Sequence, residues 1–347
     1  MKGVVFEQVG ANPKLVHDLE VPSPGPGQVL VKPIWMAINP VDAFMSKFGL
    51  LVVDWPLGLG CDSAGVVTDS GNEATEKYGL KAGDAVFGCT RLGVKGYAAA
   101  QEFHLFDAQV VFPKPDKITF QEAATLGVAS LTAALGLFNG LHIPVPDPKN
   151  LPKAQDQWLI VLGGASSVGK VAIQLAQAAG YNVIASSSPG SAEIISSLGA
   201  VPFNYKDSPE QQVKEVLKVT SGNFSRLYDA VANDDLTVVT RLFEASTFPD
   251  KYFTTTNDWN PTIKDFSGAK TDMIALGAIG RPEAEELNAK LEQYIPCIIG
   301  LIESGKLTPS EYQAIGDGGF EDAIAAYHHQ TSGAGGSRKV LVKLHDP

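Results

Sequence analysis

The sequence has few cysteines and no long apolar run. Its three cysteines, Cys61, Cys89 and Cys297, are widely spaced, and none belongs to a C-x-x-C pair. Disulfide scaffolds and cysteine-rich zinc lobes need more thiols at closer spacing. No segment approaches the run of about 18 apolar residues that would suggest a membrane-spanning helix. The composition therefore predicts neither a disulfide framework nor a transmembrane segment.

An excess of positive charge and an apolar leader are also missing. The formal net charge is -11, which disfavours nucleic acids and anionic membrane surfaces as partners. The first ten residues, MKGVVFEQVG, contain only a short apolar stretch. They are typical of a first strand rather than of a signal peptide. We therefore expect a cytoplasmic protein.

What the first third does contain is a series of short strand-like runs. They are rich in Val, Ile and Phe and are bounded by Gly, Pro, Asn and Asp, as strands of a small sheet are. The runs are GVVFEQV (3–9), GQVLVKPIWMAI (27–38), SAGVVTDS (63–70) and GDAVFG (83–88). This pattern predicts a compact β-rich domain over residues 1–125.

The middle of the chain alternates strands and helices. Residues 120–140 are helical in character, and a proline-rich loop covers residues 142–157. From Trp158 onward, apolar strands alternate with amphipathic helices that end at glycine, as after Ala179. Ser208, with Pro209 and Gln211 after it, predicts the start of a further helix. This alternation predicts an α/β fold with a doubly wound parallel sheet over residues 126–284.

The last part of the chain returns to mixed structure. A long helix is expected from Pro282 to Gly305, with a kink at Pro296. A short acidic helix (320–327) and the strand KVLVKL (339–344) follow. A terminal strand needs a sheet to pair with, and the pattern alone leaves open which of the two sheets accepts it.

The segment VLGGASSVGK (161–170) follows a strand and opens a helix. Gly164, Ser166 and Gly169 form a G-x-S-x-x-G variant of the dinucleotide fingerprint. Glycine permits the tight turn and the close helix packing, and a small serine still lets the backbone approach a pyrophosphate. The helix N-terminus, with Ser167 and Val168, offers amide groups to the phosphates. The alternative is a plain glycine-rich βα turn.

The next strand ends in ASSSPGS (185–191), which carries no carboxylate. An NAD site usually places an acidic side chain there to bond the ribose 2′-hydroxyl. Serine hydroxyls can instead donate to a 2′-phosphate, so the loop favours NADPH over NADH. The serines concerned are Ser186, Ser187, Ser188 and Ser191. Lys206 is the nearest candidate cation, and the alternative is an ordinary serine-rich loop.

Taken together, the chain resembles the medium-chain dehydrogenase/reductase superfamily, and most closely its zinc-free quinone and enoyl reductase branch. Within that branch it is similar to the fungal trans-acting enoyl reductases of polyketide and toxin clusters. The resemblance implies a GroES-like catalytic domain (1–125), a Rossmann NADP-binding domain (126–284) and a segment (285–347) that returns to the catalytic domain. The matching motifs are AINPVD (37–42), GCDSAGVV (60–67), GDAVFG (83–88), EAATLGVASLTAALGL (122–137), GGASSVG (163–169) and SLGAVPFNY (197–205).

The resemblance also implies that catalytic zinc is absent. Zinc alcohol dehydrogenases of this superfamily place ligands at positions that correspond to the segment 39–42, to Cys61 and to about Gly127. This sequence offers one thiol there and no histidine, whereas catalytic zinc needs three protein ligands. Cys61 is then expected to be a small, partly buried residue beside the active cleft, with a reactive thiol as the alternative.

Without a metal, hydride addition to a conjugated C=C bond is the chemistry expected, with an enoyl thioester or an enone as substrate. The resemblance makes Asn39, Asp42 and Thr132 the catalytic candidates and places Tyr205 near the adenosine phosphate. The alternative for Asn39 is a turn residue, and that for Asp42 is a residue that braces its loop. The alternative for Thr132 is a hydroxyl inside a helix, and that for Tyr205 is a core tyrosine. Phe44 stands where relatives often carry Lys or Tyr. The apolar segment from Phe44 to Gly60 suggests a substrate wall, with core packing as its alternative.

Three functional readings remain open at this stage. The protein acts in trans with a polyketide synthase, or as a stand-alone quinone/enone oxidoreductase, or as a non-catalytic nucleotide-binding regulatory protein. A proline and several acids follow the candidate edge strand TDMIALGAIG (271–280). Because such residues discourage edge pairing, the sequence favours a monomer over a homodimer.

Overall fold

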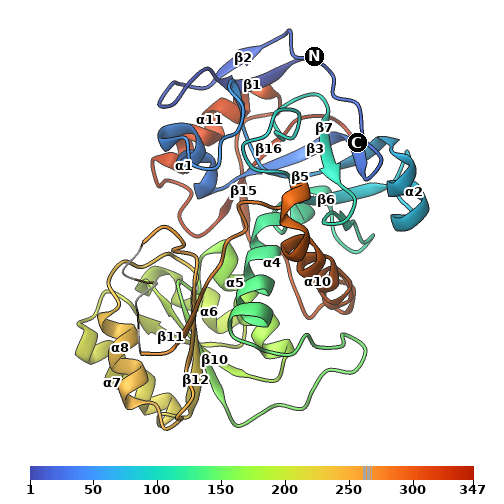
Figure 1. The fold of residues 1–347 in the computed structure, drawn as a ribbon. Helices are drawn as coiled ribbons and strands as arrows, with labels where there is room; N and C mark the ends of the chain where they lie inside the picture. The colour runs from blue at the N-terminus through green and yellow to red at the C-terminus, as the bar shows by residue number, and fades with distance from the viewer. Residues whose placement is uncertain (261–262, 264–265, 267) are drawn as a thin grey trace. The chain divides into compact units, whose positions relative to one another are not determined.

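The computed structural model describes residues 1–260, 263, 266 and 268–347, and these residues form two compact units. Each unit is assembled from separate stretches of the chain (Figure 1). The first unit comprises Met1–Val128, Leu276–Ile299 and Pro309–Pro347, and the second comprises Ala129–Ala275 and Gly300–Thr308.

The first unit is built on β-sheets, as the strand-like runs predicted. A seven-stranded sheet has the order β15-β16-β3-β5-β6-β8 with β7 paired to β3, and a smaller sheet has the order β2-β1-β4. The strands are β1 (Gly3–Phe6), β2 (Lys14–Val16), β3 (Gln28–Ile38), β4 (Leu57–Gly58), β5 (Asp62–Ser70), β6 (Ala85–Cys89), β7 (His104–Asp107), β8 (Phe112–Pro113), β15 (Tyr312–Ala314) and β16 (Lys339–Lys343). The helices are α1 (Pro40–Phe48), α2 (Asn72–Tyr78), α3 (Phe120–Ala124), the 3-10 turn η3 (Pro282–Ala284) and α11 (Phe320–Thr331).

The terminal strand β16 belongs to the first unit. It pairs antiparallel with β3, where Val340 lies opposite Ile38, and parallel with β15. Val340, Leu341 and Val342 are all fully buried. Both faces and both edges of β16 are therefore covered. The sequence left open which sheet accepts the terminal strand, and the structure places this strand in the sheet of the first unit.

The second unit holds a six-stranded parallel sheet of order β11-β10-β9-β12-β13-β14. Numbered along the chain, this is the 3-2-1-4-5-6 order of a dinucleotide-binding fold. Figure 1 shows helices on both sides of the sheet, with α7 and α8 on one side and α5 on the other. The strands are β9 (Trp158–Leu162), β10 (Asn182–Ser187), β11 (Val201–Asn204), β12 (Phe224–Asp229), β13 (Tyr252–Thr255) and β14 (Lys270–Met273).

Two helices of this unit begin at serine caps, of which the one at Ser208 was predicted. Ser166 caps α5 by accepting from the Gly169 amide at 3.0 Å, and Ser208 caps α7 by accepting from the Gln211 amide at 3.3 Å. Helix α4 continues without a break into a π-helix, η1. The helices are α4 (Gly127–Ala134, which spans the division between the units), η1 (Leu135–Gly140), α5 (Ser167–Ala178), the 3-10 turn η2 (Pro189–Ser191), α6 (Ala192–Ser197), α7 (Pro209–Thr220) and α8 (Thr237–Ala245).

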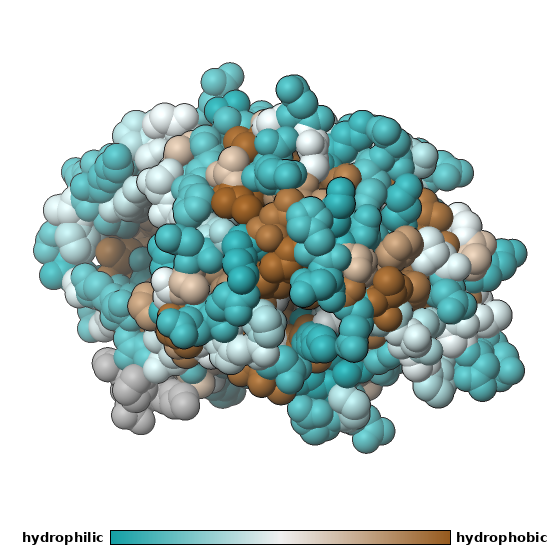
Figure 2. All heavy atoms as spheres, turned by 90° about the horizontal axis from the view of Figure 1, so that it is seen from above, coloured by the Kyte–Doolittle hydropathy of each residue, from teal (hydrophilic) through white to brown (hydrophobic). Residues whose placement is uncertain are grey.

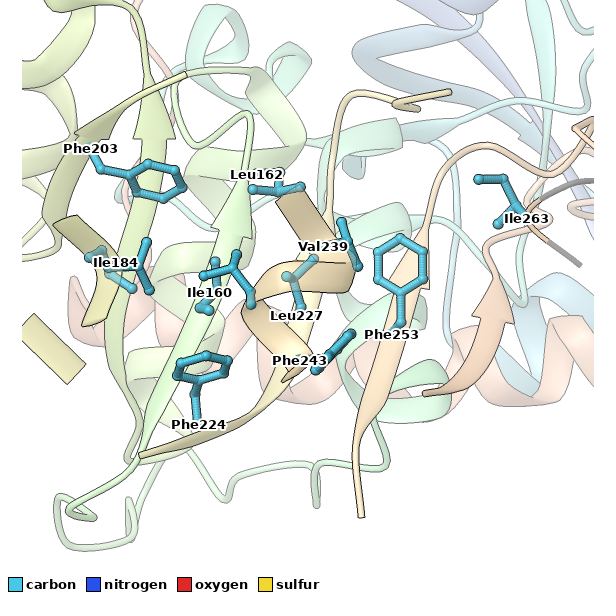
Figure 3. Packing of buried hydrophobic residues seen from close by; sticks show 12 residues of the cluster. Ile160, Leu162, Ile184, Phe203, Phe224, Leu227, Val239, Phe243, Phe253 and Ile263 are labelled. Atoms are coloured by element: carbon cyan, nitrogen blue, oxygen red, sulfur yellow. The ribbon is translucent and has the colours of Figure 1, made fainter. Parts of the chain in front are cut away.

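An apolar core joins the sheet of the second unit to its helices. Aliphatic side chains from the central strands meet Val239 and Phe243 of α8, and Phe224 and Phe253 complete the layer (Figure 3). These side chains are buried. The core therefore fixes the strands whose carboxyl ends carry the candidate site.

The units differ from the expected domain boundaries near the C-terminus. Residues 276–284 pack in the first unit, where the Arg281 guanidinium donates to the Leu51 and Leu92 carbonyls. Residues 300–308 pack in the second unit, where Thr308 bonds the Gln174 side chain. Helix α10 (Glu285–Ser304), which contains Pro296, begins in the first unit, and its residues from Gly300 onward belong to the second.

The surface is mainly hydrophilic on the face shown in Figure 2, with apolar residues exposed among the polar ones. Within the described part of the chain, no helix is both long and apolar enough to cross a membrane.

Candidate functional site

The glycine-rich turn between β9 and α5 is organised around two serines of the second unit. The Ser166 hydroxyl caps α5, while the Ser186 hydroxyl accepts from the Gly163 amide at 2.8 Å. Gly163 has a φ of 73°, and any Cβ there would strike Val231. The turn therefore requires glycine, and the Ser186 hydroxyl, predicted as a phosphate donor, is an acceptor within the turn.

The first amides of α5 point out of the helix end. The first four N–H groups of a helix have no intrahelical acceptor, and Ser166 satisfies only that of Gly169. The Ser167 and Val168 amides, together with the positive end of the helix dipole, suit a pyrophosphate. Gly164 and Gly169 allow this by packing with no side chain against β10 and against Gly163.

The remaining predicted cofactor residues lie at the carboxyl ends of β10 and β11, next to this turn. Ser187 is buried, whereas the Ser188 and Ser191 hydroxyls, 3.3 Å apart, are partly exposed. The Tyr205 side chain is 53% exposed, so it is not a core tyrosine. Because β9, β10 and β11 are adjacent and parallel, the structure brings the predicted turn, serines and tyrosine to one edge of the sheet.

A second loop at this edge was not predicted. Asp229, at the end of β12, accepts from the Val231 and Asn233 amides and from the Thr255 hydroxyl. These bonds hold Val231, which is 47% exposed, against Gly163. An aspartate that ends a buried strand was the available signal for such a loop.

Thr132 lies in the last turn of α4 before the helix widens into η1. Its carbonyl accepts from the buried Tyr228 hydroxyl at 3.0 Å. Gly136 and Gly140 let the Tyr228 ring and the Thr254 side chain approach the helix closely. Such π-helical turns are frequent at functional sites, and this one fixes the helix that carries Thr132.

The first unit contains a buried polar cluster, which we call the Lys339 cluster: Asn39, Asp42, Cys61, Asp62 and Lys339. The Lys339 ammonium, on β16, lies 3.0 Å from the Asp62 carboxylate and also donates to the Asn39 Oδ1. Asp62 accepts in addition from the Asn39 Nδ2 at 2.9 Å and from the Val128 amide at 2.7 Å. A buried charge must be paired and hydrogen-bonded, and Asp62 is both.

The side chain of Asn39 is fully engaged within this cluster. Its carbonyl oxygen faces Lys339, and its amide nitrogen faces Asp62 and the Cys61 sulfur. Its backbone N–H donates to Asp42 at 2.7 Å, across the first turn of α1. This geometry favours a bracing role for Asn39 over donation to a substrate carbonyl.

Asp42 is the second buried carboxyl group of the cluster. Burial, reinforced by the nearby Asp62 carboxylate and opposed by the Asn39 amide, raises its pKa to about 7. One of its oxygens has no hydrogen-bond partner. With one ammonium for two carboxyl groups, the protonated form of Asp42 balances the buried charge.

Cys61 is fully buried rather than partly buried. Its hydrogen bond to Cys89, its burial and the Asp42 carboxyl raise the pKa of the Cys61 thiol well above its ordinary value. The thiolate is the form that attacks electrophiles and binds metals. The geometry thus favours the small, inert residue over the reactive thiol.

The positions that the resemblance assigns to zinc ligands converge in the first unit. Asn39, Cys61 and Gly127 all lie around Asp62, and a Cβ on Gly127 would come within 2.3 Å of its Oδ1. An amide, a protonated thiol and a glycine are a poor donor set for zinc. Over the described residues, no three His, Cys, Asp or Glu side chains form a group able to hold a metal.

Comparison with known proteins matches residues 25–116 to the alcohol dehydrogenase GroES-like domain. Trans-enoyl reductase traG of Penicillium crustosum is 34% identical over 65% of this chain and 62% of its own length. Dehydrogenase orsE of Emericella nidulans is 34% identical over 63% of this chain and 68% of its own. Trans-enoyl reductase caaB of Aspergillus niger is 29% identical over 91% of each chain. The chain thus spans less than two thirds of the first of these relatives.

Solved structures share the fold over the whole chain. An alcohol dehydrogenase superfamily protein from Novosphingobium aromaticivorans has a TM-score of 0.79 at 26% identity, covering 99% of this chain and 100% of its own. Quinone oxidoreductase of Escherichia coli, solved in complex with NADPH, has a TM-score of 0.72 at 20% identity, covering 98% of this chain and 100% of its own. The second likeness concerns the fold alone.

Proposed function

Because the chain belongs to the medium-chain dehydrogenase/reductase superfamily, in its zinc-free enoyl reductase branch, we propose that it reduces activated C=C bonds with NADPH. The observation that carries the proposal is the sheet edge of the second unit. There a serine-capped helix end adjoins a strand end that offers hydroxyls and no carboxylate.

The second unit supplies the binding groups for the cofactor. NADPH, when bound, supplies the hydride. The Ser167 and Val168 amides bind the pyrophosphate. Ser188, Ser191 and Tyr205 lie at the strand ends where the ribose 2′-phosphate belongs, and the exposed Lys206 adds a positive charge there. A carboxylate at this place would repel the phosphate, so its absence favours NADPH over NADH.

The first unit supplies a rigid, metal-free frame. The Lys339 cluster ties the start of α1 to β5, β16 and the start of α4. We assign Asn39 and Asp42 to positioning within this frame, since both are buried and engaged there. Thr132 is also buried, and it remains the candidate that the resemblance gives for direct contact with the substrate or the nicotinamide.

Relatives named trans-enoyl reductases suggest the form of the substrate. An α,β-unsaturated thioester carried by a polyketide synthase fits a reductase that acts in trans. Such a substrate reaches the enzyme on a pantetheine arm, so pantetheine thioesters are suitable soluble probes.

The test follows NADPH oxidation at 340 nm with enoyl pantetheine thioesters, simple enones and quinones. We expect reduction of the thioesters and a Kd for NADPH at least tenfold below that for NADH. Turnover of quinones alone would favour the stand-alone oxidoreductase. Nucleotide binding without turnover of any acceptor would favour a regulatory protein.

A further inference from the structure

Five large apolar side chains are exposed within the eight residues that begin at the last residue of α1. They are Phe48 (65% exposed), Leu50 (46%), Leu51 (41%), Val53 (59%) and Trp55 (38%). Single exposed apolar residues are common on protein surfaces, but a contiguous group of this kind marks an interaction site. We call this group the apolar platform.

The platform is held in a fixed conformation. Leu51 has a φ of 65°, the left-handed region that a non-glycine residue avoids. One hydrogen bond holds the Leu51 carbonyl, which accepts from the Arg281 guanidinium at 3.0 Å, and the same guanidinium is anchored on the Leu92 carbonyl at 2.9 Å. The Leu51 side chain packs on Gly277, where any Cβ would come within 2.6 Å of it.

A further backbone bond completes this support. The Val53 amide donates to the Gly93 carbonyl at 2.9 Å. A strained residue held by this many contacts is typical of a binding surface whose shape matters. A loop that merely connected two elements would not need these supporting contacts.

The platform continues an apolar line that begins near the Lys339 cluster. Phe44 and Phe48 lie one helical turn apart on α1, with ring centroids 6.4 Å apart. The helix starts beside Asn39 and ends at the platform. Nine residues at about 1.5 Å each make this path about 13 Å long. An extended chain of about ten carbons, with C–C bonds of about 1.5 Å, has a similar length.

The geometry points to the apolar platform as the binding surface for the distal acyl chain of the substrate, and so to medium-length enoyl thioesters as the substrate class. This inference rests on the proposed function. The five side chains of the platform are uncharged, and Asp54, the one acid among them in the sequence, accepts from the Lys95 amide at 3.2 Å. An acidic or basic peptide therefore finds little complement there. An uncharged hydrocarbon chain is complementary to these side chains.

The test measures kcat/KM with NADPH for trans-2-enoyl pantetheine thioesters from C4 to C12. A fully buried methylene contributes about fourfold, and one half-buried on a surface about twofold. We therefore expect kcat/KM to rise about sixteenfold from C6 to C10. In the double variant Leu50→Ser/Val53→Ser this rise falls to about fourfold or less.

Val21→Ser is the matched control. Val21 is 52% exposed in the same unit and lies outside the platform, so this variant keeps the wild-type chain-length dependence. A wild type with equal kcat/KM for C4 and C10, or a double variant that retains the full dependence, would overturn the inference and leave the proposed function standing. The double variant could instead change its oligomeric state and keep the wild-type dependence of kcat/KM on chain length. That result would assign the platform to contact between copies of the chain and would also overturn the inference.

A binding measurement separates this inference from the proposed function. Affinities for the saturated acyl pantetheine thioesters are measured by calorimetry in the presence of NADP+. If no enoyl thioester is reduced, yet affinity rises with chain length and the double variant removes the rise, the platform stands and the proposed function fails. Affinity independent of chain length overturns the platform.

Discussion

At the scale of single residues, Lys339 supplies the positive charge of the buried cluster in the first unit. Its replacement by methionine leaves the buried Asp62 carboxyl group without its cationic partner. We expect Lys339→Met to lower the free energy of unfolding by about 3–5 kcal/mol in denaturant titrations. Lys343→Met is the control, because its partly exposed pair with Asp346 contributes at most about 1 kcal/mol. A loss below about 1 kcal/mol for Lys339→Met would contradict this account.

Asp42 makes stability depend on pH. Its pKa is raised to about 7 in the folded protein from an ordinary value of 3.8, so the folded state holds a proton that the unfolded state has released. The contribution of Asp42 is complete below about pH 4 and is lost as the pH rises towards 7, at about 1.4 kcal/mol per pH unit. The variant Asp42→Asn removes this slope and becomes the more stable protein at neutral pH.

Urea titrations from pH 4 to pH 8 check this prediction. Asp116→Asn, at an exposed position, is the control and should follow the wild-type curve. Parallel curves for the wild type and Asp42→Asn would show that Asp42 is ionised throughout this range.

At the scale of elements, the N-terminus of α5 starts a helix and is the proposed phosphate site. Ser166→Ala removes the cap on the Gly169 amide and is expected to cost about 1 kcal/mol of stability. It should also raise the Kd for NADPH severalfold, because the first turn frays. Ser208→Ala removes the matching cap of α7 and should cost as much stability with no change in NADPH affinity. Equal effects of both variants on affinity, measured by fluorescence titration, would contradict a phosphate site at α5.

At the scale of the whole molecule, the last strand completes the first unit. Burial of Val340, Leu341 and Val342 contributes about 5–9 kcal/mol, comparable with the stability of a domain. Deletion of residues 339–347 should therefore abolish cooperative unfolding of the first unit, followed by circular dichroism and limited proteolysis. Deletion of the exposed residues 346 and 347 is the control. An unchanged unfolding midpoint in the longer deletion would contradict the role of β16.

Local patterns in the sequence determined most of the elements and the glycine-rich turn. The Ser208 helix cap, the strand-like runs and the glycine spacing are properties of a few neighbouring residues. Such patterns predict which helices, strands and turns form, because caps, turns and periodicity act over one or two turns of chain.

Tertiary structure alone decided which distant residues meet. It placed β16 in the first sheet and brought Lys339 to Asn39 and Asp62, some 300 and 277 residues away. It placed the Ser186 hydroxyl within the glycine-rich turn and brought Arg281 to the Leu51 carbonyl. The physical reason is that burial sets the charge state of Asp42 and the engagement of Asn39, and burial depends on contacts between segments that no local pattern relates.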